Sequence, residues 1–400
     1  MNHLLASIRE KMKNCHCGHQ HKDIPIEVIE LDQNVLELVP GYLEAKNYRA
    51  ITVVCDANTY LAAGKHVNNL LEEAGFNTYV CCVKPNDRGE VAADERSLVQ
   101  VLLETPEETD AILAVGAGTL HDITRFVCYQ RKLPMISVPT AASVDGFTSA
   151  GAPLIIRGFK QTIQTVCPIA VFADLDVLLQ AQQSMTAAGL GDMLGKFTSL
   201  ADWKISNLLG NEPYCSHAAE VTKEALEGCV ENIEAISRSD LNGIKILMEA
   251  LITSGIVMVM LGHSKPASGA EHHLSHYWEM EYLRRGKAAL LHGAKVGVAT
   301  IIMSSIYRQM ADGKHGLTEM EHWEQVRNIY ATLPEQEQLQ KWLRSVNGPV
   351  TAKELGISDE LLTKSLYEAH TLRERYTGLK LLNNNDVSPI EMYYATGVFH

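Results

Sequence analysis

The feature that most constrains the fold is an alternation of short apolar runs with helical segments in the first 180 residues. The apolar, β-rich runs end at Asp56, Val83, Gly118, Thr140 and Leu178. Helix-like segments at 67–74 and 96–104 lie between them. Continuously apolar strands separated by helices are typical of a parallel sheet covered on both faces. The sequence therefore predicts an α/β, Rossmann-like nucleotide-binding domain over residues 1–180.

The pattern changes near residue 180, which predicts a second domain. Strand-like runs disappear, and segments with helical periodicity follow at 187–205, 216–236, 244–262 and 288–310. We expect an all-helical domain over residues 181–400. The most apolar part, 247–261, is too short to span a bilayer and is predicted to be a buried core helix.

Charge and cysteine usage exclude several classes of partner. The formal net charge of −13 argues against nucleic acid or an anionic membrane as the main partner. The nine cysteines are scattered and do not resemble a disulfide framework, which indicates a reduced, cytoplasmic protein. The N-terminal residues are charged and amphipathic and contain no apolar h-region, so we do not expect a secretory signal there.

A glycine turn follows the strand that begins at Ala111. The string AVGAGTLHD places Gly116 and Gly118 where a strand enters a helix, and such a turn lets backbone N–H groups approach a phosphate. The string lacks the full G-x-G-x-x-G pattern, and the strand-end acid, Asp56, lies upstream of the turn instead of downstream. Taken alone, an ordinary tight turn explains it equally well.

A loop rich in small hydroxyl residues follows the next strand. The segment SVPTAASVDGFTSAG spans 137–151, and Asp145 carries its only charge. Such a loop can surround a polar ligand without steric bulk, and the structural alternative is a polar surface loop.

The strongest pattern is a set of metal-ligand residue types on predicted helices. One carboxylate and three histidines stand in apolar surroundings, namely Asp192, His272, His276 and His292. A carboxylate with two or three imidazoles is a divalent-metal set. His272 and His276 share one helix face because they are four residues apart. Gly189 and Gly191 suggest that Asp192 lies near a helix N-terminus, and His292 is expected to begin an apolar helix.

Two neighbours of this set receive supporting roles. His273 points about 100° away from His272 on the same helix, so we expect it to pack in the interior or behind the ligands. Glu271 could be a ligand, but Asp192 already supplies one negative charge, so an orienting role is preferred.

The string CHCGHQH, residues 15–21, is dense in Cys and His. This density suggests metal binding, but the spacing is too tight and too incomplete for a standard structural zinc finger. A plain N-terminal turn is the preferred interpretation, with metal binding as the alternative.

Together, these motifs resemble the sn-glycerol-1-phosphate dehydrogenase family. That family belongs with the iron-type alcohol dehydrogenases, glycerol dehydrogenases and dehydroquinate synthases, whose architecture is expected here. The resemblance covers roughly residues 25–310 and rests on ISVPTAASVDGFTS, AAGLGDMLGK and KPASGAEHHLSH followed by LHGAKVGV. The CxCG extension before residue 25 and the long helical tail resemble the bacterial branch of the family.

The resemblance implies roles for particular residues. The turn that would hold the cofactor pyrophosphate consists of Gly116, Ala117, Gly118, Thr119 and Leu120. Asp56 would lie at the adenosine ribose. The nicotinamide side would be lined by Thr140, Ser143 and Ser149. Asp145 would touch the substrate and take part in catalysis. Ala117 replaces a glycine of many relatives and is tolerated if its φ is negative.

The implied metal ligands are Asp192, His272 and His292, with Asp192 also beside the substrate and His276 as the substrate-binding catalytic residue. One divalent ion is implied, nickel or zinc, with iron possible. Candidate cationic partners of a substrate phosphate are Lys160, Lys196 and Lys204.

The implied reaction is the NAD- or NADP-dependent interconversion of dihydroxyacetone phosphate and sn-glycerol 1-phosphate, a precursor of ether-type phospholipids. A homodimer without membrane insertion is expected. Three alternatives stay open: a glycerol or alcohol dehydrogenase with an unphosphorylated substrate, a dehydroquinate synthase-like lyase, and a non-catalytic metal- or nucleotide-binding protein. The lyase family carries Gly-Gly-Lys after its aspartate loop, whereas this chain reads DGFTSAGAP from Asp145.

Overall fold

The computed structural model describes residues 1–18, 20–313 and 317–395. The chain forms two compact units. The first contains Met1–Lys13, His21–Thr186 and Ala235–Gly262, and the second contains Asn14–Gln20, Ala187–Glu234 and the chain from His263 onward. The division into domains at residue 180 stays a prediction, because one long helix from the C-terminal part groups with the first unit.

A parallel sheet forms the centre of the first unit and confirms the predicted α/β class. Its strands are β1 (Val28–Asp32), β2 (Ala50–Cys55), β3 (Asn77–Cys82), β4 (Ala111–Gly116), β5 (Met135–Pro139) and β8 (Ala170–Asp174). They lie in the order β1-β8-β5-β4-β2-β3, and every neighbouring pair is parallel. Strands β2, β4, β5 and β8 are buried along their whole length, as their continuous apolar sequence requires.

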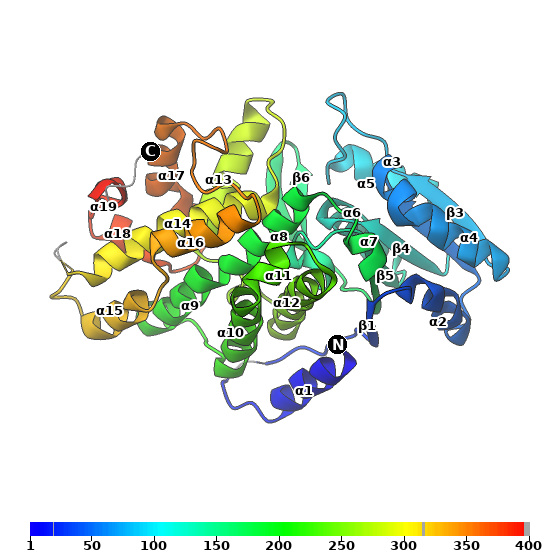
Figure 1. Cartoon of the computed structure of the whole chain (residues 1–400), viewed down its shortest axis with the longest axis horizontal. Helices are drawn as coiled ribbons and strands as arrows, with labels where there is room; N and C mark the ends of the chain where they lie inside the picture. The colour runs from blue at the N-terminus through cyan, green and yellow to red at the C-terminus, as the bar shows by residue number, and fades with distance from the viewer. Residues whose placement is uncertain (19, 314–316, 396–400) are drawn as a thin grey trace. The chain divides into compact units, whose positions relative to one another are not determined.

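Helices cover both faces of this sheet (Figure 1). Helices α2 (Val39–Ala45) and α4 (Lys65–Glu73) pack on one face, where Val53 and Val115 point. Helices α5 (Glu95–Glu104) and α6 (Gly118–Arg131) pack on the other, where Val54 and Ala114 point. Successive residues of a strand therefore pack into two separate hydrophobic cores, one on each face of the sheet.

The order of the strands creates a switch point beside β2. The chain passes from β2 to β3 on one side and then to β4 on the opposite side of β2. In open α/β sheets, ligands bind outside the carboxyl ends of the strands at such a point. The carboxyl ends of β2 and β4 carry Asp56 and the Gly116–Gly118 turn, respectively.

Two strand features were not predicted from the sequence. Strand β1 forms an edge of the sheet, and β6 (Gly151–Ile156) pairs with β7 (Phe159–Gln164) in an antiparallel hairpin. The turn of this hairpin has Arg157 and Gly158 at positive φ. Strands β1 and β7 mix polar and apolar residues, so the search for continuous apolar runs passed over them.

Helix α12 (Leu241–Leu261) belongs to the first unit. Among the described residues it is the helix that is long and apolar enough to cross a membrane, and 78% of its most apolar window is buried. Side chains from Leu247 to Leu261 are almost all buried. The predicted buried core helix is confirmed.

The remaining helices of the chain vary in length from one turn to five. They are α1 (Asn2–Lys13), α3 (Ala57–Thr59), α7 (Leu175–Leu178), α8 (Gln183–Leu194), α9 (Lys196–Gly210), α10 (Ser216–Glu231), α11 (Ile233–Ser237), α13 (Ala270–Arg284), α14 (His292–Ala311), α15 (Trp323–Ala331), α16 (Gln336–Ser345), α17 (Asp359–Glu368), α18 (Gly378–Asn384) and α19 (Pro389–Ala395).

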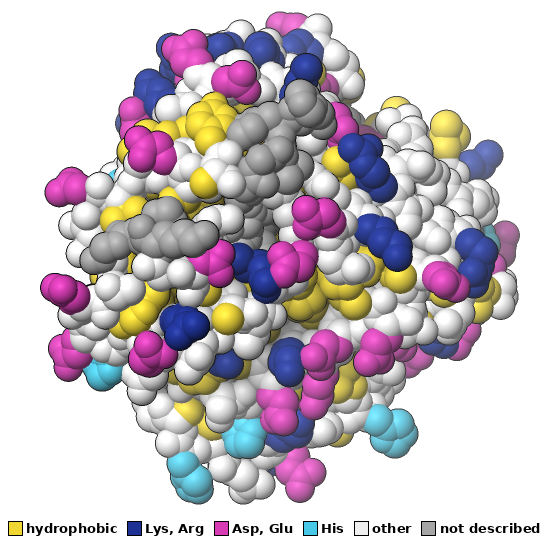
Figure 2. All heavy atoms as spheres, turned by 60° about the vertical axis from the view of Figure 1, so that its left-hand side comes forward, with side chains coloured by type: hydrophobic (Ala, Val, Ile, Leu, Met, Phe, Trp, Pro, Cys, Tyr) yellow, Lys and Arg dark blue, Asp and Glu magenta, His cyan; other side chains and the backbone are white. Residues whose placement is uncertain are grey.

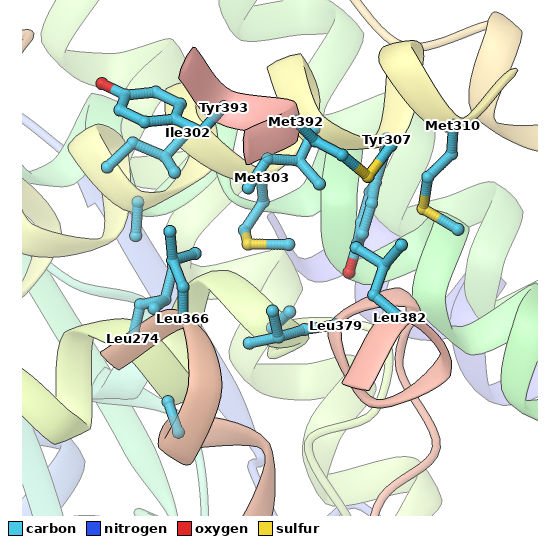
Figure 3. Close-up of a cluster of buried hydrophobic side chains, with 14 of the residues drawn as sticks. Leu274, Ile302, Met303, Tyr307, Met310, Leu366, Leu379, Leu382, Met392 and Tyr393 are labelled. Carbon is cyan, nitrogen blue, oxygen red and sulfur yellow. The ribbon is translucent and has the colours of Figure 1, made fainter. Parts of the chain in front are cut away.

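Helix α14 forms the centre of the second unit's core (Figure 3). Its side chains Met303 and Tyr307 are fully buried, and they lie among residues of α13, α17, α18 and α19. The partners labelled in the figure are Leu274, Leu366, Leu379, Leu382, Met392 and Tyr393. Helix α14 begins at His292, as expected from the sequence, although the apolar segment itself was predicted to start at residue 288.

Asp192 does not lie near a helix N-terminus, as the preceding glycines had suggested. It is in the last turn of α8, with Gly189 and Gly191 inside the helix. The glycines serve a close helix crossing instead. A Cβ atom on Gly191 would stand 2.3 Å from the carbonyl oxygen of Gly293, and one on Gly293 would stand 1.8 Å from that of Ala188. Helices α8 and α14 therefore touch backbone to backbone.

Acidic and basic side chains are interspersed on the face shown in Figure 2, with small hydrophobic patches between them. Among the described residues on this face there is no extended basic area.

Replacing Gly293 with Ala should destabilise the second unit, because its Cβ would overlap the Ala188 carbonyl. Overpacking of this kind costs about 1–3 kcal/mol or more. Gly228→Ala in α10 is the matched control, since no atom lies within 4 Å of its Cβ position and Ala is favoured in a helix by about 0.5–1 kcal/mol. Urea unfolding of both variants checks this. Equal stability of Gly293→Ala and the wild type would contradict the close crossing.

Candidate metal and nucleotide sites

The second unit brings three predicted metal-ligand residues together. Ligand atoms of Asp192, His272 and His292 all lie within 4.8 Å of one another. The three residues come from α8, α13 and α14, and the helix crossing at Gly191 and Gly293 sets the separation of Asp192 and His292. Asp192 and His272 are buried and His292 is partly exposed. A carboxylate oxygen and two imidazole nitrogens at this spacing fit one divalent ion.

The buried carboxylate of Glu271 orients His272. His272 Nδ1 donates a hydrogen bond to Glu271 Oε1 at 2.8 Å, which leaves Nε2 without a proton in the neutral ring. That Nε2 atom lies 3.7 Å from Asp192 Oδ1. A histidine held in this way by a carboxylate presents a fixed nitrogen to a metal.

Glu271 itself is held as an anion. Burial alone would raise the pKa of its carboxyl, but hydrogen bonds from His272, Thr198 and the Gly269 amide outweigh burial and hold the pKa at about 2. Its two oxygens therefore accept all of these bonds. This contact pattern agrees with the orienting role proposed from the sequence.

Asp192 has a cationic neighbour on the next helix. Lys196 Nζ lies 3.0 Å from Asp192 Oδ1, and both side chains are fully buried. Lys196 also donates to the Ala267 carbonyl at 3.4 Å. The ammonium group balances the charge of the buried carboxylate, which would otherwise be costly to desolvate.

His276 lies next to the three ligands and contacts an arginine that sequence reasoning missed. Its ring centroid is 6.4 Å from that of His272 and 6.0 Å from that of His292. Arg373 Nη2 donates to His276 Nε2 at 3.2 Å. Burial and then the nearby Arg375 lower the pKa of Arg373. The R-x-R string from Arg373 to Arg375 was the available signal, but no motif drew attention to it.

His273 lies in the interior of the second unit. It is 1% exposed, and neither ring nitrogen has a hydrogen-bond partner among the described residues. Burial and the charges of Arg375 and Arg373 lower its pKa to about 3, so the ring is neutral. It lies off the face that carries His272 and His276 because it is one residue on from His272.

The first unit carries the predicted nucleotide-binding residues at one edge of the sheet. Strand β4 ends at Gly116, and α6 begins at Gly118 with Ala117 as its N-cap. Ala117 has φ −91°, so its side chain fits the turn without strain. A Cβ on Gly116 would stand 2.3 Å from Leu120 Cδ1, which explains the glycine. Leu120 is 2% exposed, so its side chain is buried against the turn.

Asp56 caps helix α3 at the carboxyl end of β2. Its Oδ1 accepts from the Thr59 amide at 2.8 Å, and its own amide donates to Thr59 Oγ1 at 2.9 Å. Strands β2 and β4 are neighbours in the sheet. Asp56 and the glycine turn are therefore brought to the two sides of the switch point, as the parallel sheet predicts.

The hydroxyl-rich loop after β5 is held by buried contacts. Thr140, Ser143 and Ser149 are buried, and the Thr140 amide donates to the Gly116 carbonyl at 3.1 Å. Asp145 Oδ2 accepts from Ser254 Oγ at 2.8 Å, so α12 positions the only charge of the loop. Ser149 Oγ donates within its own loop, to the Gly146 carbonyl at 3.3 Å.

Arg125 anchors this loop and was also missed from the sequence. Its side chain is fully buried and donates to the carbonyls of Gly146 and Gly151, at 2.5 and 2.9 Å. Asp122 pairs with it at 2.8 Å. An arginine inside an amphipathic helix is usually exposed, so its residue type gave no signal of this role.

Comparison with known proteins identifies the family. The model of the iron-containing alcohol dehydrogenase family matches residues 30–181. A protein of Bacillus licheniformis named glycerol-1-phosphate dehydrogenase, NAD(P)+, is 48% identical over 97% of this chain and 96% of its own length. A protein of the same name from Bacillus subtilis is 47% identical over 96% of this chain and 98% of its own length.

The chain belongs to the glycerol-1-phosphate dehydrogenase family. A Methanosarcina mazei member is 32% identical over 81% of this chain and 82% of its own length. The resemblance inferred from the motifs is thereby confirmed.

Solved structures support the same fold at low sequence identity. A probable glycerol dehydrogenase from Sinorhizobium meliloti superposes with a TM-score of 0.69 at 14% identity, covering 96% of this chain and 99% of that one. Glycerol dehydrogenase from Schizosaccharomyces pombe superposes with a TM-score of 0.65 at 20% identity, covering 94% of this chain and 92% of that one. The predicted architecture is confirmed.

Mutation should separate the three ligand residues from His276. Asp192→Ala, His272→Ala and His292→Ala should each lose bound metal and activity together. His276→Ala should keep metal near the wild-type stoichiometry while kcat/KM falls by roughly 10²–10⁴. His273→Ala is the control and should change stability only modestly. Elemental analysis alongside kinetics checks this. Metal loss in His276→Ala with retention in His272→Ala would reverse the two assignments.

Proposed function

We propose that this protein is an NAD(P)-dependent oxidoreductase that reduces dihydroxyacetone phosphate reversibly to sn-glycerol 1-phosphate with the help of one divalent metal ion. The convergence of Asp192, His272 and His292 within 4.8 Å, in a member of this family, is the observation that carries the proposal.

Asp192, His272 and His292 would hold the metal ion. When bound, the ion would act as a Lewis acid that polarises the substrate ketone. The donor set suits nickel or zinc, and also iron. Three protein ligands leave room for a substrate oxygen, in contrast to a closed structural site.

The first unit would bind the cofactor. The backbone of Gly116–Leu120 would hold the pyrophosphate at the start of α6, and Asp56 would accept from the adenosine ribose. Thr140, Ser143 and Ser149 would line the nicotinamide side. Asp145, positioned by Ser254, would bind a substrate hydroxyl group.

His276 would supply the proton that the substrate oxygen takes up after hydride transfer. Because Arg373 donates to Nε2, the proton of the neutral ring lies on Nδ1. For this step the ring would first take up a second proton, would give one proton to the substrate oxygen, and would end as neutral imidazole.

Arg373 is the best-placed cation for the substrate phosphate. It contacts His276, and no carboxylate among the described residues pairs with it, so its forked guanidinium can bind phosphate oxygens. Two of the lysines suggested from the sequence are less suitable. Lys204 is exposed, and Lys196 is held by Asp192.

We further propose a cytoplasmic homodimer that binds neither nucleic acid nor membrane. This part rests on the family resemblance and on the acidic net charge of −13.

Substrate selection tests the proposed function. The wild type should strongly prefer dihydroxyacetone phosphate over dihydroxyacetone, because the phosphate-binding cation is otherwise left unpaired. Arg373→Gln should lower kcat/KM for the phosphorylated ketone by roughly 10- to 1000-fold and leave metal content unchanged. Arg373→Lys is the matched control, and its kcat/KM should lie between those of the wild type and Arg373→Gln. Equal kcat/KM of the wild type for both ketones would favour a glycerol dehydrogenase.

Asp56 should set the choice of cofactor. A carboxylate at the ribose repels the 2′-phosphate of NADPH, so Asp56→Ser should raise the NADPH/NADH ratio of kcat/KM. Serine keeps the N-cap of α3, which limits the structural change. An unchanged ratio would place Asp56 away from the ribose.

A further inference from the structure

A second group of metal-ligand residue types lies apart from the catalytic set. Cys15 and Cys17 in the N-terminal segment meet Cys215, which is 200 residues further along the chain from Cys15. The three sulfur atoms lie within 4.8 Å of one another, and a ring nitrogen of His21 completes the group. Among the described residues, this group and the Asp192 set are the two that could hold a metal.

The sequence around Cys15 and Cys17 allows both sulfur atoms to face Cys215. Residues 14–20 follow helix α1 and group with the second unit. Gly18 has φ +81°, a conformation that side chains rarely adopt, so the chain turns directly after Cys17. This turn carries the chain to His21, four residues after Cys17. The neighbouring His19 lies outside the described residues.

Cys215 is held rigidly at the start of a long helix. It is the N-cap of α10, its Sγ accepts from the Ala218 amide at 3.5 Å, and its side chain is fully buried. A buried residue therefore fixes one side of the group, while the N-terminal segment supplies the rest.

The spacing of the sulfur atoms matches a shared metal ion better than a disulfide. Cys15 Sγ and Cys215 Sγ are 3.7 Å apart. Two thiolates that bind a tetrahedral zinc ion at about 2.3 Å lie about 3.8 Å from each other. Disulfide sulfurs lie about 2.05 Å apart. A bonded pair would also leave Cys17 unused, whereas zinc uses all three thiolates.

We propose that Cys15, Cys17, His21 and Cys215 form a structural zinc site. Three thiolates and one imidazole make a closed, four-coordinate set of the kind that binds structural zinc. This set differs in chemistry from Asp192, His272 and His292, which offer no sulfur. The inference goes beyond the proposed function and does not depend on it.

The site would fasten the N-terminal segment to α10. Cys15 and Cys17 provide ligands close together in sequence, and Cys215 joins them across most of the chain. A metal ion that links distant segments contributes its binding free energy to folding. The described residues of this segment, 14–18 and 20, contain no helix or strand of their own, so the ion would replace regular hydrogen bonding as the source of their order.

Zinc content and cobalt absorption test the proposal. The full chain, purified under reducing conditions without chelator, should hold one thiolate-bound zinc ion in addition to the ion of the Asp192 set. Cys15→Ser should lose one equivalent of metal per chain, and Cys82→Ser, an exposed cysteine on β3, should lose none. Cobalt-loaded wild type should show sulfur-to-cobalt charge-transfer absorption, and Cys15→Ser should lose most of it.

His21→Ala should weaken zinc binding, whereas His16→Ala, an exposed neighbour, should leave it unchanged. Cys15→Ser is preferred to Cys215→Ser because Cys15 is only partly buried, so the variant should fold. Asp192→Ala should retain the sulfur-to-cobalt absorption, which separates this test from the proposed catalytic site. Unchanged metal content in Cys15→Ser, or a Cys15–Cys215 disulfide in place of bound zinc, would overturn the proposal.

Discussion

The backbone contact between α8 and α14 is the constraint on which the metal site depends. Gly191 and Gly293 let the two helices approach so closely that a methyl group on either glycine would overlap a backbone carbonyl of the other helix. Asp192 directly follows one glycine, and His292 directly precedes the other. The closest point of the crossing therefore also places a carboxylate beside an imidazole. Helix α13 then needs only to supply His272 to complete three ligands.

Burying so many charged groups requires compensation, and the second unit supplies it locally. Lys196 balances Asp192, and hydrogen bonds from Thr198 and His272 hold Glu271 as an anion. Asp202 accepts from the amides of Ala270 and Gly378 and from the Tyr307 hydroxyl, so it ties the start of α13 to α14 and α18. Burial and then the nearby charge of Glu271 raise the pKa of Asp202 to about 6. These contacts fix the ligand-bearing helices before any ion binds.

The sequence predicted the sheet and the three ligands because their signals are local. A buried parallel strand needs a continuous apolar run, and β2, β4 and β5 have one. His272 and His276 are related by helix periodicity alone. The glycines before Asp192 led to the wrong prediction that Asp192 lies near a helix N-terminus. The sequence alone does not distinguish a glycine at the start of a helix from a glycine at a helix crossing. Arg125, Arg373 and Cys215 were missed because their partners lie far away in sequence.

The central claim is that the Asp192 set holds an ion needed for ketone reduction. The most direct measurement is the rate of dihydroxyacetone phosphate reduction by NADH and by NADPH, using protein stripped of metal and then reloaded separately with nickel, zinc and iron. Circular dichroism of the stripped protein checks that its helices persist. We expect no turnover without metal and recovery with at least one of the three ions. Full activity of the metal-free protein would contradict the account.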